Sequence, residues 1–562
     1  MIQSIDYYAV APLLVLALTG GLVLLLDAFL PRGPYARPAL GVVTLAGVLG
    51  ALGFVISQAS RAGGPMRTFC VPGGLSNAVP GAPPGSGTGG AGASPCSFVV
   101  DDFTLIFAGL ALAAGVVVVL LSMAQLSSGE IPVGEWYFLL LCTLTGAVAL
   151  PASRDLIMLV VALELVSLPV FALTALRRYD GRSSEAAVKL FLVSVVSTAV
   201  MLFGVSLLYG TTGTVYLDRL AQVLRERMAG PAAPGPGQAL QGAGTSGGIQ
   251  ASQASEAYVS SLHIAYDPPP VDLSPLLTVA VVLVLAGFAF KVAAVPFHAW
   301  AGDVYQGAPV PVAALLSVIS KAAGFAGLIL ILVAALGSQS GTWTPLVAII
   351  AALTMTVGNL LALRQRHAVR LLAWSSVAQS GYILAPLGVH DDEATSASIA
   401  YLVFYAAMNL GAFAVVMLVS RRHPRNELDD YRGLAFRSPA AGLALVFFLI
   451  CLAGLPPGLA GMFAKIVVFR ELVGGGGTWL AVVMAVNTVI GLYYYVAWAA
   501  RILTPVPVIA ESEAEGPSAG GSRTGWVPVG IAVALAGAVA LVFSVAPQVV
   551  LDLLPEVLVA AR

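Results

Sequence analysis

Apolar runs of about 20 residues follow one another along almost the whole chain, and each is long enough to cross a bilayer as a helix. Hydrophobic residues make up 58% of the 562 residues and charged residues only 10%, whereas a soluble domain carries roughly 25% charged residues. In lipid, helices and closed barrels alone satisfy every backbone polar group. The sequence therefore predicts an all-α polytopic membrane protein. The fourteen expected helices cover residues 8–30, 37–58, 102–124, 136–150, 155–176, 186–209, 274–305, 309–336, 344–363, 369–388, 396–419, 439–473, 478–502 and 526–548.

Two of these runs, residues 274–305 and 439–473, are too long for one crossing and contain internal prolines. We expect each to form two half-helices, because proline interrupts the helical hydrogen bonds. Broken helices in matching positions of two halves are typical of transporters built from inverted repeats. Since the broken helices are the seventh and the twelfth, helices 4–8 and 9–13 are predicted to be two inverted five-helix repeats.

The repeats divide the chain into four predicted parts. Residues 1–130 form a three-helix segment with a Gly/Pro-rich loop at 59–98. The first repeat occupies residues 131–338 and carries a second long loop at 210–271, and the second repeat occupies residues 339–503. Residues 504–562 form a linker and the last helix.

The arginines predict the orientation of the chain, because short cytoplasmic connections carry an excess of basic residues. If the N-terminus is outside, fifteen arginines fall in cytoplasmic connections and seven on the outer side, so both termini and both long loops are external. The cytoplasmic set is Arg32, Arg37, Arg177, Arg178, Arg182, Arg364, Arg366, Arg370, Arg421, Arg422, Arg425, Arg432, Arg437, Arg501 and Arg523, and the outer set is Arg61, Arg67, Arg154, Arg219, Arg225, Arg227 and Arg562.

The two long loops are rich in Gly, Pro and Ser, so we expect little regular structure in them. Cys70 and Cys96 flank the first loop. An external, oxidising location permits a disulfide between them, and the alternative is two free thiols.

Lysine is rare in this chain and confined to apolar surroundings. Of the 27 basic residues only Lys189, Lys291, Lys321 and Lys465 are lysines. A lysine at the bilayer centre costs about 2.5–3.5 kcal/mol, so such a residue usually has a function. Lysines near a helix end can reach the interface instead; this alternative stays open for Lys189, and the same explanation accounts better for Arg470. Beside buried water a lysine, unlike an arginine, can accept and release a proton at ordinary pH.

The acidic counterpart of these lysines is Glu164, the only carboxylate between Asp155 and Asp180. Because a short connection joins its helix to that of Lys189, Glu164 and Lys189 are expected to form a coupled pair. Two groups of prolines, Pro296 after Lys291 and Pro456 with Pro457 before Lys465, mark helices that open toward buried water. The predicted proton path therefore consists of side chains linked by water and hydroxyls, in the order Glu164, Lys189, Lys291, Lys321 and Lys465.

Several motifs resemble the antiporter-like membrane subunits of respiratory complex I. Residues 294–325 read AVPFHAWAGDVYQGAPVPVAALLSVISKAAGF, and further matching stretches are ELVSLP from Glu164, EAAVKLF from Glu185, RLLAWSSVAQSGY from Arg370 and GLPPGLAGMFAKIVVF from Gly454. The DVYQGAP and SKAA stretches are most similar to the N members of that family rather than to the L and M members. The resemblance covers residues 100–500.

The resemblance implies roles for individual residues. It makes Glu164 and Lys189 the input pair, Lys291 the lysine of the broken helix, Lys321 the connecting lysine and Lys465 the distal one. The supporting residues are His298, Gln379, Pro296, Pro456, Pro457 and Asp303. Many family members carry histidine where this chain has Gln379, whose side chain does not titrate but can orient water.

The resemblance also implies partners and cofactors. This chain would bind no cofactor or metal itself, whereas NADH, FMN, iron–sulfur clusters and quinone would be used by partner subunits of a bacterial plasma-membrane complex. The expected neighbours are the M and K subunits of the membrane arm and lipids; a net charge of −1 argues against nucleic acid. The alternatives are a subunit of a multisubunit cation/proton antiporter and a structural spacer.

Overall fold

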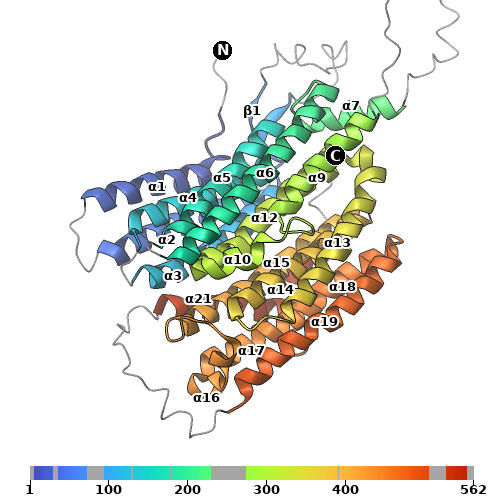
Figure 1. Ribbon diagram of the computed structural model, residues 1–562. Coiled ribbons are helices and arrows are strands. Elements are labelled where there is room, and N and C mark those ends of the chain that lie inside the picture. The colour runs from blue at the N-terminus through green and yellow to red at the C-terminus, as the bar shows by residue number, and fades with distance from the viewer. Residues whose placement is uncertain are drawn as a thin grey trace, which may run out of the picture.

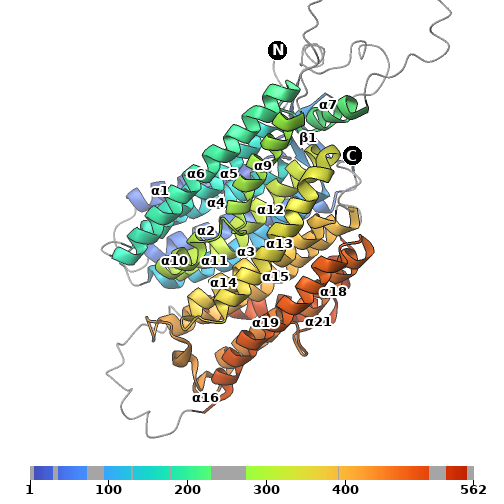
Figure 2. The same ribbon diagram turned by 45° about the vertical axis from the view of Figure 1, so that its right-hand side comes forward.

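The computed structural model describes residues 5–29, 36–61, 63–71, 94–127, 131–177, 180–229, 274–389, 392–505 and 527–553. Arg32, Arg178, Arg523 and Arg562, which were counted for the orientation, lie outside the described residues, as do most of the two long loops. The helices run side by side in one bundle, with their connections at its two ends (Figures 1 and 2).

The described elements confirm an all-α chain with membrane-spanning helices. Eleven helical segments in the described ranges are long and apolar enough to cross a membrane, while α9 and α17 are shorter apolar helices. The total of fourteen spans stays a prediction. The first elements are α1 (Ala11–Phe29), α2 (Ala36–Ala59), β1 (Met66–Cys70), β2 (Cys96–Val100), α3 (Asp102–Leu126), α4 (Val133–Ala152), α5 (Leu156–Ala175), α6 (Gly181–Thr212) and α7 (Leu217–Ala229).

The middle of the chain continues with α9 (Ser274–Lys291), α10 (Trp300–Gly307), α11 (Val310–Leu315), η2 (Leu316–Ser320), α12 (Lys321–Ile329), η3 (Leu330–Ala335), η4 (Gly337–Gln339), α13 (Ser340–Ala362), α14 (Ala368–Leu384) and η5 (Ala385–Gly388). The last elements are α15 (Asp392–Ser420), η6 (Leu428–Tyr431), α16 (Leu434–Arg437), α17 (Pro439–Ala453), α18 (Leu459–Gly474), α19 (Thr478–Leu503), α21 (Val527–Val545) and α22 (Gln548–Leu551). In the middle of the chain, η2 and η3 are π-helical turns within the long helical segment Val310–Ala335. Such turns are frequent at functional sites.

Both long apolar runs are divided into two helices, as the sequence predicts. The first break, residues 292–299, separates α9 from α10, and the second, residues 454–458, separates α17 from α18. Gly454 begins the second break with φ +81°, a left-handed conformation that glycine adopts without a side-chain clash.

Side chains of other helices satisfy backbone groups that the breaks set free. In the first break, the Val295 N–H donates to Thr354 Oγ1 of α13 at 3.0 Å. After the second break, the Ala460 N–H at the start of α18 donates to Ser544 Oγ of α21 at 3.1 Å. The breaks are therefore built into the packing of the bundle, since unpaired backbone groups are costly in an apolar interior.

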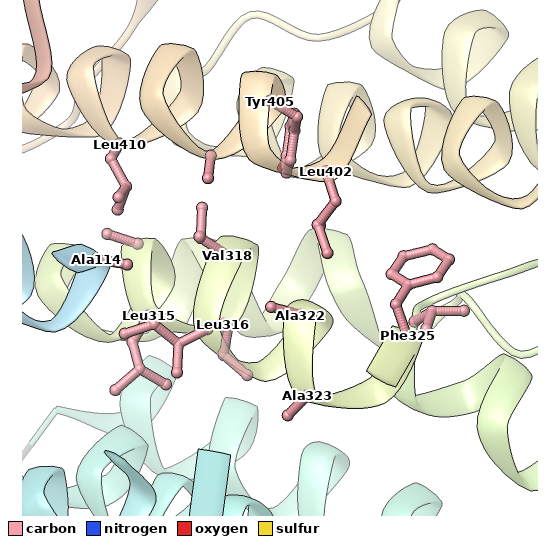
Figure 3. Packing of buried hydrophobic residues seen from close by; sticks show 14 of the residues in the cluster. Ala114, Leu315, Leu316, Val318, Ala322, Ala323, Phe325, Leu402, Tyr405 and Leu410 are labelled. Carbon is pink, nitrogen blue, oxygen red and sulfur yellow. The ribbon is translucent and has the colours of Figure 1, made fainter. Parts of the chain in front are cut away.

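The core lies where α15 packs against the segment from α11 to α12. Both are buried along most of their length, and α15 also contacts α3, α14, α17, α18 and α21. Leu402 and Leu410 of α15 extend toward the segment that carries Val318 and Ala322, whereas Leu315 lies on the side of that segment away from α15 (Figure 3). A helix that is buried on all its faces has a continuously apolar sequence. A polar residue within such a helix therefore needs a hydrogen-bond partner nearby.

The long loops contain more regular structure than the sequence predicts. In the first loop β1 and β2 pair as an antiparallel hairpin, and in the second α7 is an amphipathic helix. Cys70 and Cys96 lie opposite each other in the hairpin and form a disulfide, so the disulfide alternative is confirmed. Gly/Pro/Ser composition alone hid these elements, because the short strands and α7 occupy the edges of the loops rather than their centres.

The hairpin and α7 lie at one end of the bundle, and α16 lies at the other (Figures 1 and 2). Phe98 of β2 pairs with Ser153, and Asp155 pairs with Tyr216, just before α7. Both loops thus meet the α4–α5 connection, which agrees with the prediction that they share one side of the membrane.

Candidate functional site

A buried ion pair joins α5 and the end of α9. Lys291 is the last residue of α9, and its Nζ lies 3.1 Å from Glu164 Oε1, 2.7 Å from Ser167 Oγ and 3.4 Å from Ser194 Oγ. The Lys291 side chain is 5% exposed and that of Glu164 22%. Thr198 of α6 donates a further hydrogen bond to Glu164 Oε1 at 2.8 Å. The carboxylate and the hydroxyls together stabilise a charge that would be costly in an apolar interior.

The predicted pair of Glu164 with Lys189 is wrong in this structure. The residue of α6 that reaches Glu164 is Thr198, nine residues after Lys189. At 1.5 Å per residue this separation is about 14 Å along the helix axis. A short connection between α5 and α6 did make them neighbours, but their relative shift along the axis could not be read from sequence.

Lys189 instead belongs to an exposed charge cluster. Its Nζ lies 2.7 Å from Glu185 Oε1 and 3.0 Å from Asp303 Oδ2 of α10. The other carboxylate oxygen of Asp303 pairs with Arg370 of α14 at 3.1 Å. Asp303, which is 39% exposed, therefore ties α6, α10 and α14 together at their shared end.

A small cavity opens beside Lys291. Its volume is about 20 Å³, enough for roughly one water. Its polar lining includes Lys291, Ser167, Ser194 and Ser320, and Trp300 also lines it. Because Ser320 directly precedes Lys321, the cavity extends from Lys291 to the segment that carries the next lysine of the predicted path.

Lys321 is buried among neutral groups. It lies directly after the π-helical turn η2 and is 1% exposed. Its Nζ donates to the Ser376 carbonyl and, at 2.7 Å, to Ser380 Oγ of α14. Among the described residues no carboxylate lies within ion-pair distance of Lys321, so its ammonium can lose a proton without leaving an opposite charge behind.

Beyond Lys321, side chains of α14 and α15 form further polar contacts with one another. Ser376 Oγ lies 2.7 Å from the hydroxyl of Tyr405, which donates to the Ser317 carbonyl at 3.2 Å. One turn away, Gln379 accepts from Tyr401 at 2.7 Å and donates to Tyr495 at 3.2 Å. Gln379 therefore has partners on both sides of its amide and holds two tyrosines in place.

Lys465 lies at the far end of this polar group. Its Nζ donates to the carbonyls of Leu452 and Ala453, at 3.1 and 2.6 Å, and lies 5.9 Å from the ring centre of Tyr382. Tyr382 stacks on Tyr401 with 5.9 Å between ring centres. The lysine thus caps the C-terminal end of α17, where a cation is favoured by the helix dipole.

The remaining predicted residues have supporting positions. Pro296 lies in the first break, and Pro456 and Pro457 lie in the second. His298 packs edge-on against Trp374, with 5.8 Å between ring centres. Arg470 is exposed and pairs with Glu393 and Glu471, which fits its predicted place outside the path.

A path through hydroxyls was predicted, but the particular hydroxyls near the lysines were not identified from the sequence. Ser376 and Ser380 are four residues apart in α14, and Tyr401 and Tyr405 are four residues apart in α15. This spacing places each pair on one helix face, so polar pairs inside apolar runs were a usable signal. In the described residues, no group of three or more His, Cys, Asp or Glu side chains could hold a metal ion.

Comparisons with known proteins agree on one family. A family model described as NADH:quinone oxidoreductase/Mrp antiporter, TM, matches residues 153–491. NADH-quinone oxidoreductase subunit N 2 of Streptomyces griseus is 44% identical over 564 residues, covering 98% of this chain and 93% of that protein. A chain of respiratory complex I from Thermus thermophilus superposes with a TM-score of 0.66 at 28% identity, covering 96% of this chain and 98% of that one. A chain of the Mrp complex from Dietzia sp. DQ12-45-1b shares the fold, with a TM-score of 0.72 at 20% identity and coverages of 99% and 97%.

Proposed function

Since this chain belongs to the NADH:quinone oxidoreductase/Mrp antiporter family of membrane proteins, we propose that it is a proton-translocating, N-type subunit of an NADH-quinone oxidoreductase. The support comes from two directions. The relative from Streptomyces griseus that bears the subunit N name matches nearly the whole chain. The interior independently contains three lysines that bond to interior groups: Lys291 and Lys321 bond to serine hydroxyls, and Lys465 bonds to backbone carbonyls. Such buried amines are suited to moving protons.

The proposed path begins at Glu164 and Lys291, whose ion pair lies beside the small cavity. It continues to Lys321 and then, through the Ser376–Tyr405 and Gln379–Tyr401 contacts, toward Lys465. Water and rotating hydroxyls would carry protons between these groups. The observation that carries the proposal is Lys321, a fully buried amine whose bonded partners are a carbonyl and a serine hydroxyl.

Lys189 has a different role in this proposal. It lies in the exposed cluster with Glu185 and Asp303, so it would receive or release protons at the edge of the bundle.

Partner subunits would supply the energy. This chain would have no redox role and bind no cofactor, and electrons would pass from NADH through FMN and iron–sulfur clusters to quinone in other subunits. The neighbours in the membrane arm would be the M and K subunits. The chain would lie in a bacterial plasma membrane with both termini and both long loops outside the cytoplasm.

Substitution of Lys321 tests the proposal. In membrane vesicles containing the assembled complex, Lys321→Met and Lys321→Arg should each lower the rate of NADH-driven proton uptake by roughly tenfold, equivalent to about 1.4 kcal/mol at the limiting step. Arginine keeps the charge but does not deprotonate in proteins. Unchanged proton uptake with normal assembly would favour the structural-spacer alternative. Proton movement that follows a sodium gradient without NADH oxidation would favour a cation/proton antiporter, whose fold the Mrp chain shares.

A further inference from the structure

The short helix α10 is held by polar side chains of two neighbouring helices. Arg370 Nη1 of α14 lies 3.1 Å from Asp303 Oδ1 and donates to Gln306 Oε1 at 3.0 Å. Lys189 Nζ of α6 lies 3.0 Å from the other oxygen of the Asp303 carboxylate. We call Lys189, Asp303, Gln306 and Arg370 the α10 clamp. It fixes a helix of only eight residues from two sides.

The α10 clamp lies next to the small cavity of the proposed path. Trp300, the first residue of α10, lines that cavity, and its ring lies 5.5 Å from the ring of Phe290 between centres. Asp303 follows three residues later, and residues three apart are neighbours on a helix surface. On α6, Leu190 lines the cavity and directly follows Lys189. The clamp and the cavity therefore share one side of α10, at the end of the bundle predicted to be cytoplasmic.

The two ends of α10 are attached differently. Tyr305, in its second half, is fully buried in the core. The first end follows residues 292–299, where the helix is broken. Toward α14 the contact is made by Gly302, where an added Cβ would lie 2.7 Å from the ring of Trp374, so no side chain of α10 interlocks with α14 there. The first end, which carries Trp300, can therefore tilt while the second half stays anchored.

The ion pairs of the α10 clamp are weak enough to open. The side chains of Lys189, Asp303 and Arg370 are 44%, 39% and 33% exposed. Ion pairs in contact with solvent contribute little to stability and are screened by salt. The buried pair of Lys291 and Glu164 has no such freedom, because separating it would leave a charge in the interior. The clamp is thus suited to a part of the molecule that opens and closes.

We propose that Arg370 is a positioning residue that holds Trp300 as a movable wall of the cavity, and that release of the α10 clamp opens the cavity toward the end of the bundle predicted to be cytoplasmic. With the clamp closed, the cavity has room for roughly one water. With the clamp open, it admits small solutes from that end. Arg370 exchanges no proton itself. This inference rests on the proposed function, because it concerns access to the first ion pair of the path.

Thiol labelling of the assembled complex in membrane vesicles measures this opening. Ser320 lines the cavity, and Ser320→Cys introduces a thiol there at nearly constant size. Its rate of modification by iodoacetamide, a small uncharged reagent, is read from the mass of its peptide. The native, half-buried Cys142 of α4 is the internal reference. We expect Ser320→Cys to react severalfold more slowly than Cys142, and equal rates would overturn the proposal, because the cavity would then already be open.

Substitution of Arg370 releases the clamp. In Arg370→Gln we expect the labelling of Ser320→Cys to become severalfold faster while that of the reference cysteine stays the same. Arg370→Lys keeps the charge but lacks the fork that reaches two acceptors, so its labelling rate should lie between the other two. The matched control is Arg470→Gln, which removes another exposed arginine from its ion pairs and should change neither rate. Unchanged labelling in an assembled Arg370→Gln complex would overturn the proposal.

Salt provides a second measurement that leaves the clamp residues in place. Raising the salt concentration from about 0.01 M to about 1 M shortens the Debye length from about 30 Å to about 3 Å, which weakens the partly exposed ion pairs of the clamp. We expect the labelling of Ser320→Cys to rise severalfold relative to that of Cys142. If Arg370→Gln does not assemble, an unchanged ratio over this salt series overturns the proposal.

The labelling rate and the proposed function can fail separately, because labelling needs no NADH. If Lys321→Met leaves NADH-driven proton uptake unchanged while Arg370→Gln speeds the labelling of Ser320→Cys, the proposed function fails and the α10 clamp stands. If Lys321→Met stops proton uptake while Arg370→Gln is labelled as slowly as the unsubstituted clamp, the inference about the clamp fails alone.

Discussion

The two broken helices place their lysines on opposite sides of the break and against different partners. Lys291 ends the helix before the first break and meets the carboxylate of Glu164. Lys465 belongs to the helix after the second break and reaches back to the carbonyls of Leu452 and Ala453. Similar breaks in two halves of one chain therefore do not create equivalent sites.

The difference lies in what compensates the ammonium charge. At the first break an opposite formal charge does so, and hydroxyls of Ser167 and Ser194 assist it. At the second break the partial charges at a helix C-terminus do so. An ion pair resists the loss of either partner, whereas neutral acceptors tolerate an uncharged amine. The first site is thus suited to a coupled change of charge, and the second to release of a single proton.

The largest expected effect comes from breaking the ion pair. Removing one partner of a buried pair costs about 3–5 kcal/mol, because an uncompensated charge is left behind. Since Glu164 is partly exposed, we expect Lys291→Met to cost about 3 kcal/mol and to lower the amount of assembled complex on native gels. Adding Glu164→Gln should restore assembly without restoring proton uptake. A double variant that assembles as poorly as Lys291→Met would contradict the account of the first break.

A smaller effect is expected at the second break. Lys465→Met leaves the carbonyls of Leu452 and Ala453 without their donor, at a cost of about 1–3 kcal/mol in thermal unfolding of the complex. Lys465→Arg keeps a donor and a positive charge but cannot release a proton. We therefore expect Lys465→Arg to assemble normally while its proton uptake per NADH falls. Normal proton uptake by Lys465→Arg would show that this lysine only caps α17.

The sequence predicted the breaks correctly because their causes are local. Proline and glycine interrupt helices wherever they occur, and runs longer than a bilayer had to be divided. The four lysines were also identified, since a charged residue in an apolar run is conspicuous. Three of them, Lys291, Lys321 and Lys465, lie in the interior and bond to interior groups, whereas Lys189 lies at the edge.

The pairing of charges could not be predicted, because it depends on how far one helix is shifted along another. A shift of two to three turns placed Thr198, not Lys189, beside Glu164. The hairpin of β1 and β2 was missed for a different reason, since a two-stranded pair of five residues each gives almost no periodic signal. The tyrosines of α15 read as ordinary apolar residues until their partners in α14 were known.

Substitutions of Gln379 test whether the polar contacts on the side of the second break take part in proton uptake. Its amide joins Tyr401 to Tyr495, so Gln379→Leu leaves two buried hydroxyls short of a partner and should cost about 1–2 kcal/mol of thermal stability. Gln379→His keeps one donor and one acceptor and adds a titratable group. We expect Gln379→His to retain proton uptake and Gln379→Leu to lower it. Equal proton uptake in both would mean that the amide only packs between the tyrosines.

The smallest expected effect comes from Thr198→Val, which alters the site at the first break without removing a charge. Thr198→Val deletes the hydroxyl that donates to Glu164 Oε1 but preserves the shape of the side chain. The carboxylate keeps Lys291, so the stability loss should be about 1 kcal/mol, and proton uptake should fall only slightly. Thr211→Val is the matched control, because in the described part of the chain the Thr211 hydroxyl bonds to backbone carbonyls of α6 itself. If Thr198→Val abolished proton uptake while Thr211→Val did not, the Thr198 hydroxyl would be part of the proton path. The ion pair alone would then not explain how the first break differs from the second.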